Sequence, residues 1–584
     1  MSFNLPFYLI LFITILSINS KRNLMEEEEK SDDIIILHTN DVHCGIDQII
    51  GYDGLMLFKK ELETKYKHVI LVDAGDHIQG GSIGLLSKGK DIIDIMNKIN
   101  YTVATLGNHE FDYQLEILYN LSSLSNKEYI CANFCYRVNK TSIFAPYRII
   151  QVGEKKIGFI GLVTLQTLTK TYLHSLVYPE NNTLIYDVLN GEHGKELYER
   201  VQQHIDDLRD VEHVDYVIII SHFGYGGDSL KEYTSTGLLE NLERVDAIID
   251  GHTHLIYNET HKDKKSKDIY ISQAGTKLSN VGKITITTEG NITSEMFDEI
   301  PLFEGYTDYM KVTRNNKTRY VDPEMNEFLK SIINSHEKEF KEYVGKTDFD
   351  VLGASSKEHV MRSGENNLCD LITDSMKYLG NSDLALLNAG SIRNDLLKGN
   401  ITYSNIIDVL PFANRLVVLE IQGKDLLDIL EFGVRTLPGI SSRFSQVSGI
   451  HFKVDDSIKS PVIVNDMESF DRIEGERRIY DVFIGNESLD ENKNYTISVN
   501  DYLASGGDGY SMLSKYKKRN DTSVEMSVVL KDYIKNVLNE SIPERYNNTQ
   551  GRIIKEKKER KANNSNTFIK YYKRLSILLL SLVF

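Results

Sequence analysis

The fold is decided by a short apolar run that ends in metal-binding side chains, IIILHTNDVH (residues 34–43). Its first four residues predict a buried strand. Asp41 and His43 follow two residues apart, so an extended segment can present both to one pocket. Because carboxylates and imidazoles are ligands for divalent metals, the stretch predicts an α/β protein with a metal site at the end of a strand.

The same arrangement recurs four times downstream. The further runs are 69–72, 101–106, 216–220 and 245–249, and they lead to Asp76, to Asn108 and His109, to His222, and to His252 and His254. Helical patterns lie between some of them, over 55–62 and 92–96. A lone histidine after a strand is more often a surface or core residue. Five strand ends in series instead predict that these side chains converge beyond the carboxyl ends of a parallel sheet.

The chain has 584 residues, which is more than one hydrophobic core usually supports. The metal-ligand series lies in a segment that we place at 32–310. An amphipathic helical pattern over 320–345 predicts a connector, and a second α/β segment with its own glycine turns follows at 346–555. The sequence therefore predicts two α/β units joined by a helix.

Both ends carry patterns typical of an exported protein. Residues 1–20 fit a signal peptide, with a buried first strand as the alternative. The apolar tail at 575–584 is too short to span a bilayer, and 563–584 has the layout of a glycosylphosphatidylinositol (GPI) attachment signal, with a frayed terminus as the alternative. Glycosylation sequons fit export and include Asn120, Asn139, Asn291, Asn486 and Asn539. We expect a secreted or cell-surface glycoprotein held by a lipid anchor rather than by a spanning helix.

The formal net charge of −17 disfavours nucleic acid as a partner, so an anionic substrate must be held locally by metals and a few arginines. Export permits disulfides among the four cysteines. Cys131 and Cys135 are the expected pair because they are close in sequence, although three pairings are open. Cys44 follows a predicted ligand and is either a metal neighbour sensitive to oxidation or a small packing residue.

Motifs in the second unit suit a nucleotide. Three phrases follow strand-like runs and combine glycine with polar and aromatic residues: NAGSIR (388–393), LPF (410–412) and DYLASGGDGY (501–510). The planar guanidinium of arginine can donate two parallel hydrogen bonds to a phosphate, aromatic rings can stack on a base, and a carboxylate can accept hydrogen bonds from ribose hydroxyls. Taken alone, Phe412 could be core packing and residues 506–509 could be a loop.

At this point the sequence resembles a known family. The phrases TNDVH (39–43), DAGD (73–76), GNHEFD (107–112), SHFG (221–224) and GHTH (251–254) resemble the calcineurin-like metallophosphoesterase set in the form used by 5′-nucleotidases. The second-unit phrases, with RSGENNL (362–368), resemble the C-terminal domain of the same family. The resemblance implies a four-layer α/β/β/α metallophosphoesterase domain, a helical connector and a C-terminal α/β substrate domain.

The resemblance also implies roles for the metal ligands. One ion would be held by Asp41, His43, Asp76 and His254, and the other by Asp76, Asn108, His222 and His252. The cofactors would be two divalent ions, with zinc first and manganese, cobalt or magnesium as alternatives. His109 would act beside the phosphate, oriented by Asp112.

For the substrate, the resemblance implies that Arg362 and Arg393 bind the phosphate. Asn388 would contact the base, and Phe412 and Tyr502 would stack on its two faces as a clamp. Asp508 would bind the ribose. Two positions depart from the family's usual pattern: Cys369-Asp370 stands where Gly-Asn is usual, and Ala389 stands where a glycine is usual.

We expect a monomer or homodimer that hydrolyses extracellular nucleoside 5′-monophosphates. An apyrase or nucleotide-sugar hydrolase is the alternative enzyme. A surface binding protein that keeps the fold without activity is the alternative of another class.

Overall fold

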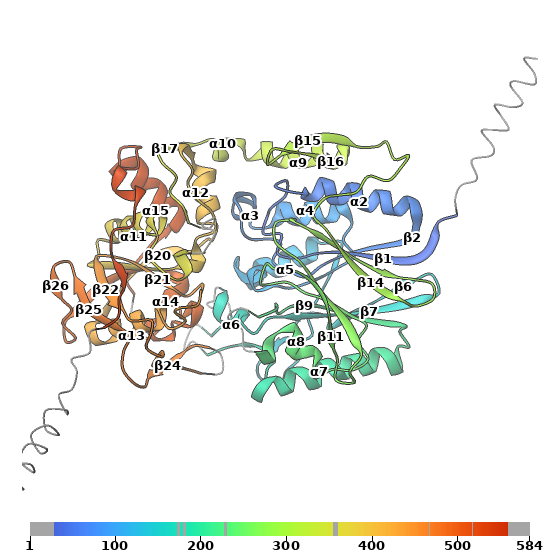
Figure 1. Cartoon of the computed structure of the whole chain (residues 1–584), viewed down its shortest axis with the longest axis horizontal. Coiled ribbons are helices and arrows are strands. Elements are labelled where there is room, and N and C mark those ends of the chain that lie inside the picture. Colours follow the sequence, from blue (N-terminus) through green and yellow to red (C-terminus); the bar gives the residue numbers. More distant parts are fainter. Residues whose placement is uncertain are drawn as a thin grey trace, which may run out of the picture.

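The computed structural model describes residues 29–558 except 172–175, 179–182, 227–230, 354–359, 466–467 and 517. These residues form two lobes that lie side by side, the first blue to green and the second yellow to red (Figure 1). The predicted signal peptide and anchor signal lie outside the described residues. Within the described ranges, no helix is both long and apolar enough to cross a membrane.

A six-stranded sheet carries the first metal-binding motifs. In spatial order its strands are β14 (Ile292–Phe297), β13 (Val281–Ile286), β1 (Ser31–Thr39), β2 (Tyr66–Asp73), β3 (Val103–Thr105) and β4 (Glu128–Ile130). Strands β1 to β4 are parallel, whereas β13 runs antiparallel to β1. The carboxyl ends of β1, β2 and β3 therefore meet at one edge, as the sequence predicts.

A second six-stranded sheet carries the remaining motifs. In spatial order its strands are β11 (Ile256–Lys262), β12 (Asp268–Ala274), β10 (Ala247–Ile249), β9 (Tyr216–His222), β7 (Lys155–Val163) and β6 (Tyr147–Val152). The four central strands are parallel. A separate small ribbon pairs β5 (Phe134–Tyr136) with β8 (Tyr186–Val188).

The two sheets pack face to face, and helices cover their outer faces. Alternation along β1 shows why its run is continuously apolar: Ile34 and Ile36 face the other sheet, while Ile35 and Leu37 face the helices. The helices of this lobe are α2 (Gly51–Lys65), α3 (Ser82–Ser87), α4 (Lys90–Ile99), α5 (Leu115–Leu124), α6 (Thr167–Lys170), α7 (Lys195–Asp206) and α8 (Ser235–Leu239). The predicted four-layer α/β/β/α arrangement is confirmed.

The connector begins as a hairpin, β15 (Met310–Arg314) with β16 (Lys317–Val321), and continues as α9 (Pro323–Ser335) and α10 (Glu337–Phe340). Asp322 caps α9 by accepting the Met325 N–H at 2.8 Å. The prediction of helix up to residue 345 is wrong beyond α10. Residues Tyr343–Thr347 form strand β17, because they pair with β19 (Gly399–Thr402) and bury Val344 in the second lobe.

The second lobe has one hydrophobic core around a mixed five-stranded sheet. That sheet runs β21 (Ser445–Ser448), β18 (Leu384–Asn388), β27 (Asn494–Asn500), β20 (Arg415–Gln422) and β28 (Lys518–Glu525). Smaller sheets contain β26 (Glu487–Ser488), β25 (Ile479–Ile484), β22 (Ile450–Val454) and β29 (Ile553–Lys555), and β23 (Val462–Val464) with β24 (Phe470–Ile473). The helices are α11 (Asn367–Gly380), α12 (Tyr403–Val409), α13 (Gly423–Gly433), α14 (Asp501–Ala504) and α15 (Met526–Asp532).

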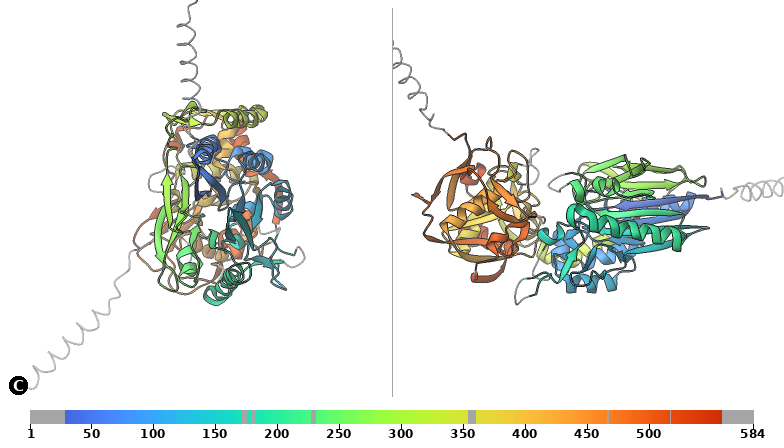
Figure 2. Two further views of the ribbon diagram at one scale, coloured as in Figure 1. Left: turned by 90° about the vertical axis from the view of Figure 1, so that its right-hand side faces the viewer. Right: turned by 90° about the horizontal axis from the view of Figure 1, so that it is seen from below.

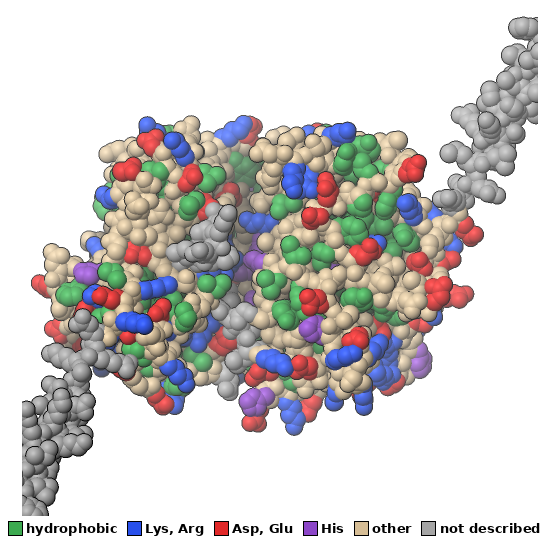
Figure 3. All heavy atoms as spheres, in the orientation of Figure 1, with side chains coloured by type: hydrophobic (Ala, Val, Ile, Leu, Met, Phe, Trp, Pro, Cys, Tyr) green, Lys and Arg blue, Asp and Glu red, His purple; other side chains and the backbone are tan. Residues whose placement is uncertain are grey.

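The two lobes meet at the edge of the first lobe where its metal-binding loops lie. Figure 2 shows them as two bodies joined over a limited area. Contacts across the boundary include Arg393 with His109 and Tyr502 with Thr169. Histidine and Lys/Arg atoms are visible along the groove between the lobes in Figure 3. The fold thus brings the predicted metal ligands against the predicted nucleotide-binding loops.

Candidate active site

The structure brings six of the predicted metal ligands into two groups. Asp41, His43 and His254 form one group, and Asp76, His222 and His252 form the other; within each group the ligand atoms lie within 4.8 Å of one another. The groups are adjacent, since His43 Nε2 is 3.7 Å from Asp76 Oδ2. Asp76 therefore occupies the position between the two groups at which a carboxylate could bridge two ions.

Neighbouring carbonyl groups fix which imidazole nitrogen faces the groups. His43 Nδ1 lies 2.9 Å from the Gln79 carbonyl, and His222 Nδ1 lies 2.6 Å from the Ala74 carbonyl. A carbonyl only accepts, so each Nδ1 carries a proton, and Nε2 is the nitrogen turned toward the metal-binding carboxylates. The Nε2 of His222 is 3.0 Å from Asp76 Oδ2, and the carboxylates of Asp76 and Asp41 outweigh burial and raise the pKa of His222 to about 10. Such carbonyl partners are typical of metal-binding histidines.

The polar atoms left inside the two groups fit divalent cations. Asp41 Oδ1 and Asn108 Oδ1 are buried without a hydrogen-bond partner. The Nε2 atoms of His43 and His254 lie 3.1 Å apart. Buried oxygens without donors are costly unless a cation satisfies them, and two imidazole nitrogens this close together could bind the same cation. The donor set of carboxylates, imidazoles and one amide oxygen suits zinc and related ions.

The ligand loops are held in strained backbone conformations. The φ angles of Asp41, His43, Asp76, His252 and His254 are 48°, 45°, 59°, 81° and 58°. L-residues rarely adopt this left-handed region, and strain of this kind clusters at functional sites. The rest of the fold must therefore hold these five ligands in place.

Two buried carboxylates that sequence reasoning missed supply part of that support. Glu110 accepts the Asp76 N–H at 2.7 Å and the Gly107 N–H at 2.6 Å, which joins the loops after β2 and β3. Asp250 accepts the Gly224 N–H at 3.1 Å and the Gly251 N–H at 2.9 Å, which joins the loops after β9 and β10. Their only sequence signal was their place inside or beside the quoted motifs.

Close packing explains the glycine in GNHEFD. A Cβ atom at Gly107 would lie 2.1 Å from Asp76 Oδ1. No side chain fits at that distance, so the loop that carries Asn108 approaches the loop that carries Asp76 only with glycine there.

His109 lies beside the metal groups and faces the second lobe. Its Nδ1 is 2.6 Å from Asp112 Oδ2, and its Nε2 is 3.3 Å from an Nη of Arg393. Burial by itself lowers the pKa of His109, but the carboxylates of Asp112 and Asp76 outweigh burial and raise the pKa. The ring also lies 5.6 Å from the ring of Phe412, centroid to centroid.

Two arginines of the second lobe converge at the same place. Arg393 is held by its Nε, which donates to the Gly390 carbonyl at 2.9 Å, and its guanidinium lies over the Phe412 ring at 5.1 Å. Burial, followed by the charge of Arg362, lowers the pKa of Arg393 to about 10. Two guanidinium groups that act on each other offer paired positive charges to an anion, despite the negative charge of the whole chain.

The remaining predicted substrate residues form a connected group. Asn388 Nδ2 donates to Asp508 Oδ2 at 2.6 Å, and the Asp508 N–H donates to the Tyr502 hydroxyl at 2.8 Å. All three side chains are buried. The structure therefore brings Asn388, Tyr502 and Asp508 together, and it places Arg393 and Phe412 against His109.

Comparisons with known proteins agree with this geometry. The calcineurin-like phosphoesterase model matches residues 34–255, and the model for the 5′-nucleotidase C-terminal domain matches residues 344–515. Together the matched segments cover more than half of the chain and contain all the predicted site residues. The chain belongs to the 5′-nucleotidase family. It is therefore a hydrolase of the calcineurin-like metallophosphoesterase class.

Individual relatives of this family match over most of the chain. A 5′-nucleotidase of Vibrio cholerae is 26% identical, over 87% of this chain and 91% of its own length. A trifunctional nucleotide phosphoesterase protein of Bacillus subtilis is 24% identical over 89% of this chain, but the chain spans only 35% of its length. The structure of a 5′-nucleotidase precursor from Thermus thermophilus shares the fold, with a TM-score of 0.71 at 24% identity over 90% of this chain and 100% of that one.

The expected disulfide between Cys131 and Cys135 is wrong. All four cysteines are free thiols. The two sulfur atoms have different partners, since Cys131 Sγ lies 3.5 Å from Asn133 Oδ1 and Cys135 Sγ lies 3.7 Å from the Asp187 carbonyl. Cys44 is buried, its pKa is raised to about 12 by burial, and its Sγ donates to the Ile78 carbonyl at 3.2 Å. The packing role for Cys44 is therefore favoured.

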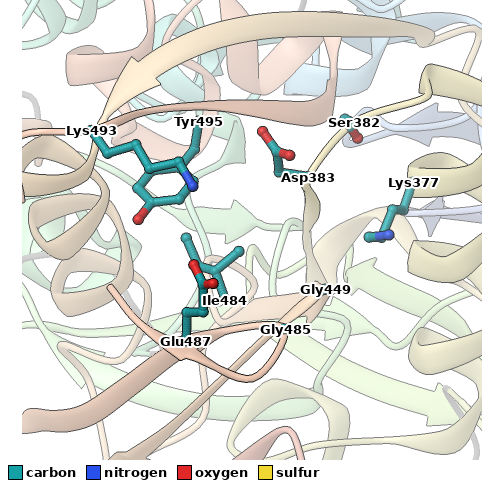
Figure 4. A pocket seen from close by; sticks show the side chains of 9 residues that line it. All are labelled: Lys377, Ser382, Asp383, Gly449, Ile484, Gly485, Glu487, Lys493 and Tyr495. Carbon is teal, nitrogen blue, oxygen red and sulfur yellow. The ribbon is translucent and has the colours of Figure 1, made fainter. Parts of the chain in front are cut away.

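A pocket of about 350 Å³ lies elsewhere in the second lobe. Figure 4 shows side chains that line it, among them Lys377, Asp383, Glu487 and Lys493. None of its lining residues is a predicted site residue, so this pocket is separate from the groove that holds the metal ligands.

Proposed function

We propose that this family member hydrolyses extracellular nucleoside 5′-monophosphates to nucleoside and phosphate, using two divalent ions. The observation that carries the proposal is the meeting of two metal-ligand groups with His109 and Arg393, whose facing nitrogens are 3.3 Å apart across the lobe boundary. Phosphate chemistry and nucleotide recognition then share one groove.

The metals would be held by the predicted ligands, with Asp76 shared between Asp41, His43 and His254 on one side and Asn108, His222 and His252 on the other. Zinc is the preferred ion because imidazole and carboxylate ligands dominate, and manganese, cobalt or magnesium are alternatives. When bound, two such ions supply Lewis-acid polarisation of the phosphoryl oxygens and an activated water.

The protein's own groups orient the ester and handle the leaving oxygen. Arg362 and Arg393 would hold the phosphate through charge-assisted hydrogen bonds. Because Asp112 holds Nδ1 of His109, its Nε2 faces the groove, where it would stabilise charge or give a proton to the departing 5′-oxygen.

Nucleoside recognition would fall to the second lobe. Phe412 and Tyr502 offer aromatic faces for the base, Asn388 offers an amide for its polar edge, and Asp508 offers a carboxylate for ribose hydroxyls. The bonds from Asn388 to Asp508 and from Asp508 to Tyr502 already orient three of these groups.

Turnover would require the lobes to separate and close again. The connector supports a hinge after α9: Arg314 makes a bidentate bond to the buried Asp53 of the first lobe at 2.8 and 2.6 Å, whereas Glu342 pairs with Lys531 of the second lobe at 3.5 Å. The first lobe also holds His336, whose Nε2 lies 2.7 Å from Asp91 Oδ2, so residues 337–341 lie between the ties to the two lobes. A disulfide that staples the lobes together should slow turnover at saturating substrate, and an unchanged rate would refute the hinge.

An extracellular site is part of the proposal. A cleaved leader at 1–20 and a lipid anchor attached within 563–584 would place the enzyme on the cell surface, as a monomer or homodimer. Its sequons support glycosylation, because Asn120, Asn139, Asn291, Asn486 and Asn539 are all exposed.

A metal-supplemented substrate panel tests the function. Purified protein with Zn²⁺ or Mn²⁺ should release phosphate from AMP, and a chelator should abolish the release. Higher kcat/KM for ADP or UDP-glucose than for AMP would replace the proposal with a diphosphate hydrolase. No phosphate release from any nucleotide would refute it.

A further inference from the structure

Two glutamine-bearing segments cross from the metal ligands to the second lobe. The first runs from the loop after β7 into α6. Gln166 Oε1 is 2.9 Å from His252 Nε2. Three residues later, the Thr169 carbonyl accepts a hydrogen bond from the Tyr502 hydroxyl at 2.7 Å. Gln166 and Thr169 are both buried. One short segment therefore touches a metal ligand and one side of the nucleobase clamp.

The second segment follows β2. The Gln79 carbonyl accepts from His43 Nδ1 at 2.9 Å, while its side-chain Nε2 donates to the Pro411 carbonyl at 3.2 Å. Pro411 directly precedes Phe412, the other side of the clamp. Gln79 is 1% exposed, so water does not compete for these bonds. Each metal group thus has one histidine tied, through a glutamine segment, to one clamp residue.

We propose that Gln79 and Gln166 are positioning residues that couple closure of the clamp to placement of the metal ligands His43 and His252. The inference rests on the proposed function, because it takes these histidines as ligands and Phe412 and Tyr502 as the clamp. Neither glutamine touches the reacting atoms.

The physical reason is linkage. An acceptor that holds one imidazole nitrogen fixes the tautomer and ring orientation of a metal ligand, and loss of such a partner typically weakens metal affinity by about 10- to 100-fold. The bonds from Tyr502 to Thr169 and from Gln79 to Pro411 exist only while the lobes are together. A nucleoside that favours the closed arrangement must therefore strengthen metal binding, and metal must strengthen nucleoside binding by the same factor.

The experiment measures metal affinity rather than activity. Zn²⁺ or Mn²⁺ dissociation constants are determined by chelator competition, with and without saturating 5′-deoxyadenosine. This probe has neither a phosphate nor a 5′-oxygen, so any change in metal affinity passes through the protein. We expect the nucleoside to tighten metal binding by about 5- to 150-fold in the wild type, the usual range of coupling between sites.

The variants separate the two halves of each link. Gln166→Leu removes the acceptor for His252 and should weaken metal binding by about 10- to 100-fold without nucleoside, whereas Gln166→Glu keeps an acceptor and should restore it. Gln79→Leu keeps the backbone carbonyl that accepts from His43 but removes the side-chain hydrogen bond to the Pro411 carbonyl. Tyr502→Phe keeps the aromatic ring but removes the hydroxyl that donates to the Thr169 carbonyl. Both variants should reduce the factor by which the nucleoside tightens metal binding.

The outcomes are distinct. Wild-type protein that hydrolyses AMP and binds the probe, yet shows no change in metal affinity, overturns the coupling alone. Equal tightening in Gln79→Leu, Gln166→Leu and the wild type also overturns it. Absence of both probe binding and AMP hydrolysis overturns the proposed function, and the coupling falls with it. If Gln166→Leu does not fold, Tyr502→Phe and Gln166→Glu still decide, because a tightening unaltered by Tyr502→Phe contradicts the link through Thr169.

Discussion

Replacing Arg393 with methionine should lower kcat/KM for AMP without lowering the free energy of unfolding. The guanidinium is half-buried, lies near Arg362 and His109, and has a carbonyl, that of Gly390, as the acceptor for its Nε. Its pKa is lowered to about 10 from 12.5 by burial and by Arg362. That lowering corresponds to at most about 3 kcal/mol against the charged form, and to roughly 1–2 kcal/mol after allowance for solvent screening.

Two opposite effects follow. Without substrate, Arg393→Met removes a disfavoured charge, so the free energy of unfolding should stay the same or rise by about 1 kcal/mol. With substrate, the variant loses charge-assisted hydrogen bonds to phosphate, each contributing about 1.5–3 kcal/mol, so kcat/KM for AMP should fall by about 10- to 150-fold or more. Steady-state phosphate release and urea unfolding measure the two effects.

Arg478 is the matched control. It is fully buried, and its guanidinium donates to backbone carbonyls, including those of Val434, Arg435 and Leu437, rather than to a predicted site residue. Arg478→Met should therefore lower the free energy of unfolding by about 2 kcal/mol or more. If Arg393→Met behaved like this control, losing stability while keeping kcat/KM, the reading of Arg393 as a phosphate ligand would be refuted.

Three further predictions concern the scaffold. Arg314→Met leaves the buried carboxylate of Asp53 without its bidentate partner and should lower the free energy of unfolding by about 3 kcal/mol in urea; an unchanged midpoint would contradict the tie. Burial lowers the pKa of Lys127 to about 7 from 10.5, so between these values the unfolded chain holds a proton that the folded chain has lost. Lys127→Met should accordingly be more stable than wild type at pH 6, and the advantage should shrink as the pH rises toward 10; a constant difference would refute the buried lysine. Thiol titration of the unreduced, denatured protein should find all four cysteines free, and only two reactive thiols would reinstate a disulfide such as Cys131 to Cys135.

The metal ligands could be predicted from the sequence because parallel strands end at one edge. Asp41 and Asp76 follow neighbouring parallel strands of one sheet, so sheet geometry required them to converge. His222 ends β9 of the second sheet, and it joins them only because the two sheets pack face to face. The four-layer arrangement and the substrate loops came from the resemblance to a family, since periodicity alone does not say which sheets pack together.

What the sequence did not predict depends on side-chain direction and tertiary pairing. Tyr343 continues a helical spacing, yet its segment pairs with β19 and becomes strand β17. Cys131 and Cys135 are close in the chain, but their sulfur atoms face different partners. Gln79 and Gln166 lie in loops with no motif of their own, and only the folded chain shows what they touch.

The most direct test of the central claim is to locate the metals. Crystals grown with Zn²⁺ or Mn²⁺ and a non-hydrolysable AMP analogue should show two anomalous peaks per chain, about 3.5–4 Å apart as in other two-metal sites, with Asp76 bonded to both. The analogue's phosphate should contact Arg393, and its base should lie between Phe412 and Tyr502. A single peak, or peaks away from Asp76, would contradict the two-metal nucleotidase described here.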